Sequence, residues 1–153
     1  PKTLFREDPY KELYTKKSLD EVKLWLTQTV FPAVSAHMES LRDSRRKSIV
    51  RQAVAYIHEH YNRSDLSLNL LAEQFRLTPS YVSKLFKEHT EQNFMDYLIA
   101  IRMEASKERL ADRKLKISEI AEAVGYTNIH SFLRTFKKYT GMTPKSYQKQ
   151  AIS

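Results

Sequence analysis

Two stretches of this chain repeat each other, and the repeat constrains the fold more than any other feature. Leu71-Ala72-Glu73 is matched by Ile120-Ala121-Glu122 at an offset of 49 residues, and Phe86-Lys87 is matched by Phe136-Lys137 at an offset of 50. A duplicated helical unit with one inserted residue explains both offsets. We therefore expect the chain to contain the same small fold twice.

Each copy is typical of two helices joined by a tight turn. The first helix carries a small residue, Ala72 or Ala121, that lets its partner approach closely, as two helices crossing at roughly 90–120° in a helix-turn-helix require. Gly125 suits the second turn, whereas Arg76 stands in the first and costs energy if its φ is positive. The apolar positions of the two second helices are Val82, Leu85, Phe132 and Phe136.

The residue content favours an all-α fold. Only two glycines and five prolines are present, too few for the turns of a multistranded sheet. Thr78-Pro79 and Thr143-Pro144 each predict a helix start, with a capping threonine before a proline, and Gly141 predicts a left-handed residue after a helix. The predicted helices are Leu68 to Phe75, Pro79 to Thr90, Phe94 to Ala111, Ser118 to Val124, Asn128 to Tyr139 and Pro144 to Gln150.

The N-terminal third is also expected to be helical. Ser18-Leu19-Asp20-Glu21 has the form of a capping box and predicts a helix from about Leu19 to Val30 that stops near Pro32. Apolar residues then recur at helical spacing, which one long helix or two abutting helices would both produce. These residues are Val34, Met38, Leu41, Val50, Ala53, Ile57 and Tyr61.

Charge and composition limit the partners. Lysine and arginine number 26 against 18 acidic residues, a net charge of +8 that favours nucleic acid or an acidic membrane surface. The absence of cysteine excludes disulfides and thiolate metal sites and fits a reducing cytosol. Apolar runs are far shorter than the roughly 20 residues that span a bilayer. Because the chain starts at Pro1 without a signal pattern, we expect a fragment or a processed chain.

Residues Ile49 to Tyr147 resemble the AraC-type (AraC/XylS-type) transcription regulators. The first copy matches in Ser67-Leu68-Asn69-Leu70-Leu71-Ala72 and Ser80-Tyr81-Val82-Ser83-Lys84-Leu85-Phe86-Lys87. The second copy matches in Ile117-Ser118-Glu119-Ile120-Ala121-Glu122-Ala123-Val124-Gly125-Tyr126, in Phe132, in Phe136-Lys137-Lys138 and in Gly141-Met142-Thr143-Pro144. The second signature is the longer and more specific one.

The resemblance implies a bacterial transcription regulator that binds double-stranded promoter DNA sequence-specifically, with RNA polymerase as a further partner. It implies two helix-turn-helix subdomains, at about 67–90 and about 117–139, joined by a rigid linker helix at about 94–111. Their recognition helices would enter successive major grooves. A linker of about 18 residues spans about 27 Å, compatible with recognition helices about 34–36 Å apart. A metabolic operon, for instance one for carbohydrate use, is the expected target.

By position against the family pattern, nine side chains are expected to meet DNA. The expected base contacts are Ser80, Ser83, Lys84, Asn128, His130 and Arg134, and the expected phosphate contacts are Lys87, Lys137 and Lys138. Arginine and lysine can grip guanine, asparagine suits adenine, and Leu133 could touch a thymine methyl. For each of these residues the alternative is a solvated side chain on a helix face.

Residues 1–48 are expected to form a helical linker or signalling segment ahead of a DNA-binding domain at 49–153. They lack the alternating strands of the sugar-binding barrel found in some family members. They look more like the linker of response-regulator or membrane-anchored members. We expect a cytoplasmic protein whose upstream part could carry a membrane anchor. The inducing signal, activation against repression, and homodimer formation through the upstream region stay open.

An enzyme and a protein-interaction module are the two alternative classes of function. An enzyme is disfavoured because the sequence has no glycine-rich phosphate loop, no G-x-S-x-G and no H-E-x-x-H motif, and no cofactor or metal is expected. His58 and His60 stand about 200° apart around a helix and cannot chelate together. A protein-interaction module would use the helices between Leu19 and Tyr61 for self-association, although such apolar stripes more often pack on their own domain. A plain bundle of paired helices is the alternative fold.

Overall fold

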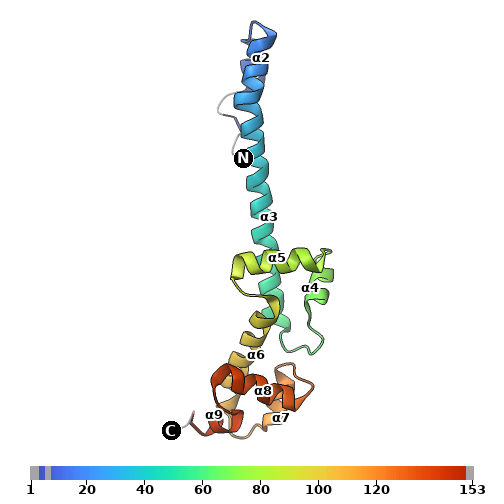
Figure 1. Cartoon of the computed structure of the whole chain (residues 1–153), viewed down its shortest axis with the longest axis vertical. Coiled ribbons are helices and arrows are strands. Elements are labelled where there is room, and N and C mark those ends of the chain that lie inside the picture. The colour runs from blue at the N-terminus through green and yellow to red at the C-terminus, as the bar shows by residue number, and fades with distance from the viewer. Residues whose placement is uncertain (1–3, 6–7, 151–153) are drawn as a thin grey trace. The chain divides into compact units, whose positions relative to one another are not determined.

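The computed structural model describes residues 4–5 and 8–150, and every regular element among them is a helix. The expected all-α fold is confirmed. The chain divides into two compact units, residues 1–48 and 49–153. In chain order the elements are α1 (Pro9–Tyr14), α2 (Leu19–Trp25), the π-helix η1 (Leu26–Val30), α3 (Phe31–His60), α4 (Leu68–Gln74), α5 (Pro79–Thr90), α6 (Phe94–Leu110), α7 (Ile117–Ala123), α8 (Ile129–Thr140) and α9 (Pro144–Gln150) (Figure 1).

The start of α2 follows the predicted capping pattern with one shift. The Ser18 hydroxyl accepts a hydrogen bond from the backbone N–H of Glu21 at 3.2 Å. The Glu21 carboxylate accepts from the backbone N–H of Lys17 at 2.8 Å, one residue earlier than a capping box requires. The preceding helix α1, which begins after the capping side chain of Asp8, was not predicted.

Pro32 does not end the helix, so that prediction was wrong. The chain continues from α2 through η1 into α3, which contains Pro32 as its second residue. Proline lacks an N–H, and its ring clashes with the carbonyl four residues earlier in an α-helix. In η1 the bonding is wider, because the N–H of Phe31 donates to the oxygen of Leu26, five residues back. The wider turn accommodates Pro32, so the helix continues from η1 into α3 without a break.

The apolar stripe at the start of α3 is exposed. Val34, Met38 and Leu41 expose 39%, 48% and 53% of their surface. Among the described residues up to 48, Trp25 alone is buried, so this unit offers no core that the stripe could join. The prediction that the stripe packs on its own domain was therefore wrong.

The C-terminal unit contains two apolar cores that share α6. The last turns of α3 pack with α4, α5 and the first half of α6, which contributes Phe94 and Leu98. The second half of α6 contributes Met103 and Leu110 to a core with α7 and α8. Figure 1 shows α6 leading from the helices of the first group to those of the second. One helix thus belongs to both copies.

The duplication seen in the sequence extends to ring contacts and caps. Phe86 meets Tyr97 edge-on at 5.2 Å, and Phe136 meets Tyr147 in the same way at 5.6 Å between ring centroids. Thr78 and Thr143 cap their helices as predicted. The bounds of the six predicted helices from α4 to α9 agree with the structure within one residue. The two copies therefore have the same internal construction.

The two copies differ at their left-handed positions. In the second copy Gly125 and Gly141 adopt φ angles of 94° and 81°. In the first copy the corresponding residues are Arg76 and Glu91, at φ angles of 54° and 60°. Residues with a Cβ pay for this conformation. Arg76 therefore has the positive φ for which the sequence predicts an energetic cost, and Glu91 is a second residue of this kind.

Candidate nucleic-acid interface

Helix α5 presents one polar face away from its core. Ser80, Lys84 and Lys87 are exposed and Ser83 is half-buried, and their spacing of three and four residues brings all four to the same side of the helix. The opposite side carries three buried side chains, which fix the rotation of the helix on its core. They are Val82, Leu85 and Phe86.

The positive charge on this face is partly neutralised. Lys84 lies 3.9 Å from the carboxylate of Glu88, one turn further along, and both side chains are at least half exposed. Such exposed pairs contribute little to stability and exchange readily with other partners. Helix α5 therefore offers a weakly basic face.

Helix α8 presents a more strongly basic face. His130, Arg134 and Lys137 are exposed and follow one another at intervals of four and three residues, and exposed Lys138 lies beside them. The helix contains no acidic residue, and within the described part of the chain no carboxylate forms an ion pair with these cations. The positive charge of this face is therefore available to bind a polyanion.

Arg134 lines two hollows on the surface of the C-terminal unit. One is lined by Arg134 together with Asp96 and Tyr139, and the other by Arg134 together with Lys137 and Lys145. Lys145, in the first turn of α9, was missed by sequence reasoning, although the Thr143-Pro144 cap already fixed where that turn begins. It adds a cation beside Lys137.

Asn128 has a structural role that restricts what else it can do. Its Oδ1 accepts the backbone N–H of Ser131 at 3.1 Å and caps α8. A bidentate contact to adenine uses both the amide oxygen and the amide nitrogen of asparagine. One of the two lone pairs of this oxygen is engaged in the cap, so the side-chain N–H groups, which the cap does not use, are what Asn128 offers most readily to a partner.

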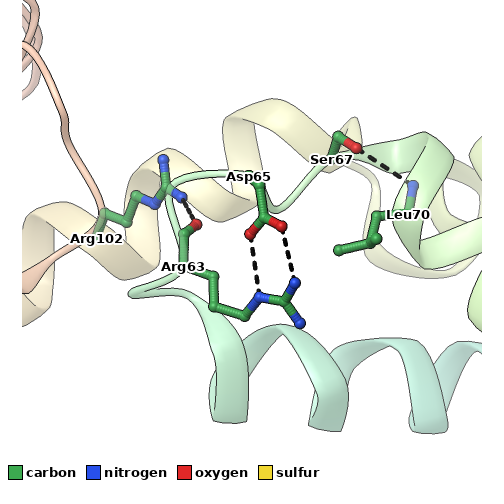
Figure 2. A network of polar contacts seen from close by, with 5 residues as sticks. All are labelled: Arg63, Asp65, Ser67, Leu70 and Arg102. Atoms are coloured by element: carbon green, nitrogen blue, oxygen red, sulfur yellow. Dashed lines mark hydrogen bonds and ion pairs between the residues drawn. The ribbon is translucent and has the colours of Figure 1, made fainter.

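Arg102, on α6, is a second residue that sequence reasoning missed. It is 8% exposed, and its Nε and Nη2 donate to the backbone oxygens of Tyr61 at 2.8 Å and Arg63 at 2.7 Å; the second bond is drawn in Figure 2. Burial lowers the pKa of the guanidinium, but arginine stays charged in proteins. The available signal was a row of buried positions at intervals of four, Phe94, Leu98, Arg102, Ser106 and Leu110, in which an arginine is out of place.

The described residues contain neither a candidate metal site nor a candidate membrane span. Among them no group of three or more histidine, aspartate or glutamate side chains could hold a metal ion. None of the described helices combines the length and the apolar character that a membrane span requires. The Nε2 atom of His58 lies 3.2 Å from the Tyr97 hydroxyl, so the partner of this histidine is a tyrosine side chain.

Comparisons with known proteins agree on one family. A family model described as a helix-turn-helix domain matches residues 71–150. The chain is 33% identical over 115 residues to the Msm operon regulatory protein of Streptococcus mutans, covering 75% of this chain and 41% of that protein. It is 33% identical over 97 residues to the raffinose operon transcriptional regulatory protein RafR of Pediococcus pentosaceus, covering 63% and 35%.

A solved structure has a similar fold and sequence. The C-terminal domain of AraT, a response regulator from Geobacillus stearothermophilus, is 41% identical with a TM-score of 0.65, covering 67% of this chain and 84% of that one. Among eight curated relatives, the chain spans from 18 to 42% of each relative's own length. The similarity thus concerns one part of longer proteins.

Proposed function

This chain belongs to the AraC-type family of helix-turn-helix transcription regulators, and from that premise we propose that residues 49–153 bind double-stranded DNA sequence-specifically. The observation that carries the proposal is the pair of exposed polar faces on α5 and α8, one in each copy of the duplicated unit. Each face is backed by a core that fixes its direction. A recognition helix requires this arrangement.

The length of α6 supports binding across two successive major grooves. Its 17 residues correspond to about 26 Å at a rise of about 1.5 Å per residue. Recognition helices in successive grooves lie roughly 34–36 Å apart, and the helices on each side of α6 add to its length. We propose that α5 and α8 read two half-sites on one face of the duplex.

Base reading is assigned to the residues nearest the centre of each face. In the first copy these are Ser80, Ser83 and Lys84, and in the second they are His130, Arg134 and the amide N–H groups of Asn128. Lys87, Lys137 and Lys138 are assigned to phosphates, which position a protein without specifying sequence. The greater free charge of α8 supports a larger share of the affinity for the second copy.

The wider role follows from the family. RafR is named as a regulator of the raffinose operon, which supports control of an operon for carbohydrate use. Promoter DNA and RNA polymerase are the proposed partners, in the cytoplasm, and residues 1–48 are the proposed signalling linker. The exposed stripe around Met38 supports self-association as one way in which that linker acts. Membership of a family of transcription regulators supports assigning the chain no catalytic role.

Selection of genomic fragments followed by footprinting tests this proposal. We expect one recurring sequence with two protected half-sites about one helical turn apart on the same face. A variant with Arg134 and Lys137 both changed to alanine should lose this protection. The matched control changes Lys11 and Lys23, exposed lysines of the N-terminal unit, and should keep it. Uniform binding to all fragments, or a single protected groove, would contradict the proposal.

A further inference from the structure

Arg102 lies on α6 where the first core gives way to the second. Leu98, one turn before it, belongs to the first core, and Met103, directly after it, belongs to the second. Arg102 is only 8% exposed, so its side chain is surrounded by protein from both copies. Any change in how the copies lie against each other changes the surroundings of this one guanidinium.

On one side Arg102 holds the segment that leads into the first helix-turn-helix. Its two hydrogen bonds end on the backbone oxygens of Tyr61 and Arg63. Arg63 is paired through two hydrogen bonds, of 3.1 and 2.8 Å, with Asp65, and Ser67 then caps α4, as Figure 2 shows. The Tyr61 ring packs against both cores. Arg102 is thus bonded to a segment that local hydrogen bonds hold in place and whose Tyr61 packs against both cores.

On the other side Arg102 meets the turn of the second helix-turn-helix. Its guanidinium carbon lies 5.5 Å from the centre of the Tyr126 ring. Gly125 is so close that an added Cβ would lie 2.9 Å from Nη2 of Arg102 and 2.9 Å from the oxygen of Tyr61. The turn at Gly125 therefore packs directly against the Arg102 guanidinium and against the Tyr61 carbonyl, to which that guanidinium is hydrogen-bonded.

We propose that Arg102 is a positioning residue that fixes the orientation of the second helix-turn-helix relative to the first, and thereby sets the half-site separation that the chain accepts. The planar guanidinium fork bonds only in defined directions, so both carbonyls are satisfied in one arrangement of the copies. The inference about DNA rests on the proposed function. The inference about orientation does not.

The orientation is tested without DNA. The chain has no cysteine, so Glu73→Cys and Glu122→Cys, exposed and equivalent in the two copies, provide two unique labelling sites. We expect a narrow distribution of distances between the labels in the otherwise unchanged protein and a broad or shifted one with Arg102→Met. Arg109→Met is the control and should leave the distribution narrow, because the hydrogen bond of Arg109 within the described residues goes to the Ala105 oxygen of the same helix.

The half-site separation is tested with duplexes whose spacer is lengthened or shortened by a base pair or two. Arg102→Met should weaken binding at the preferred spacing by about tenfold or more, because a loosened link lowers the effective concentration of the second unit. The affinity of this variant should fall less on duplexes with altered spacings and should be unchanged on isolated half-sites. The difference in affinity between preferred and altered spacings therefore becomes smaller. Arg109→Met should keep the preference of the unchanged protein.

The outcomes separate the two proposals. If the unchanged protein selects no DNA sequence, the proposed function fails while the label distances still decide the role of Arg102. An unchanged distance distribution in folded Arg102→Met, or equal losses on every duplex including half-sites, would overturn the positioning role. Should Arg102→Met not fold by circular dichroism, Arg102→Lys replaces it and should show partial broadening. If that variant also fails to fold, Arg102 is a core residue and the inference is wrong.

Discussion

Gly125 and Gly141 form a matched pair for measuring how tightly the two copies are packed. Both have left-handed backbones, with φ angles of 94° and 81°. A Cβ on Gly141 would meet nothing within 4 Å, whereas a Cβ on Gly125 would meet Arg102 and the Tyr61 oxygen at 2.9 Å. Gly141→Ala therefore measures the cost of the backbone conformation, and Gly125→Ala measures that cost together with the contact.

The expected magnitudes follow from these two terms. An alanine in a left-handed conformation costs about 1–2 kcal/mol, offset in part by the lower entropy of its unfolded chain, so Gly141→Ala should destabilise by about 1 kcal/mol. Overpacking adds about 1–3 kcal/mol, which gives about 2–4 kcal/mol for Gly125→Ala. The contact is costly because the Tyr61 oxygen is backbone and the Arg102 guanidinium is held by two hydrogen bonds.

Urea unfolding measures both variants on the same scale. The free energy of unfolding is extrapolated to water, and the slope with urea shows whether the unfolding transition itself has changed. Far-ultraviolet circular dichroism confirms that each variant is folded beforehand. Equal destabilisation of the two variants would refute the reasoning, because it would mean that Gly125 carries no close contact with Arg102.

Three further predictions concern the first copy, the exposed face of α8 and the boundary between the two units. Arg76→Gly and Glu91→Gly should each raise the free energy of unfolding, by up to about 1 kcal/mol, because they relieve left-handed strain; a loss of stability in urea would contradict this. Arg134→Ala should cost about 1–3 kcal/mol on the preferred duplex and relax discrimination at one or two base pairs, whereas Lys137→Ala should weaken binding to all sequences and lower the salt slope by about 0.9. Titrations on preferred and scrambled duplexes at several salt concentrations separate the two, and equal weakening of both duplexes by Arg134→Ala would rule out base reading. The fragment 49–153 should fold and bind the same sequence as the whole chain in the same titration, and a changed preference would show that residues 1–48 contact DNA.

The sequence predicts well what depends on neighbours along the chain. Thr78 and Thr143 cap the helices they were expected to cap, and Arg76 is left-handed because it occupies the place of Gly125 in the repeat. Pro32 was misjudged because a local rule about proline does not foresee that a wider turn can accommodate it. Even here the deciding hydrogen bond joins residues close in sequence.

The candidate site was predictable only in part. The exposed face of α8 follows from helical spacing, since buried Phe132 and Phe136 fix which side Arg134 occupies. The contacts of Arg102 do not follow from it, because its acceptors lie 39 and 41 residues earlier in the chain. Helical periodicity marks Arg102 as facing a core but does not reveal which carbonyls it meets there.

Both long-range hydrogen bonds of Arg102 end on main-chain oxygens, which bears on how proteins of this design can change over evolutionary time. The bonds depend on the path of the backbone at residues 61–63 and not on which side chains stand there. The faces of α5 and α8 lie on other elements, so under the proposed function substitutions on them would alter sequence preference while these two bonds persist. An insertion or deletion directly after α3, ahead of residue 61, would instead move both carbonyls at once. Point substitution and length change would therefore act on separate properties: which bases are preferred, and how far apart they stand.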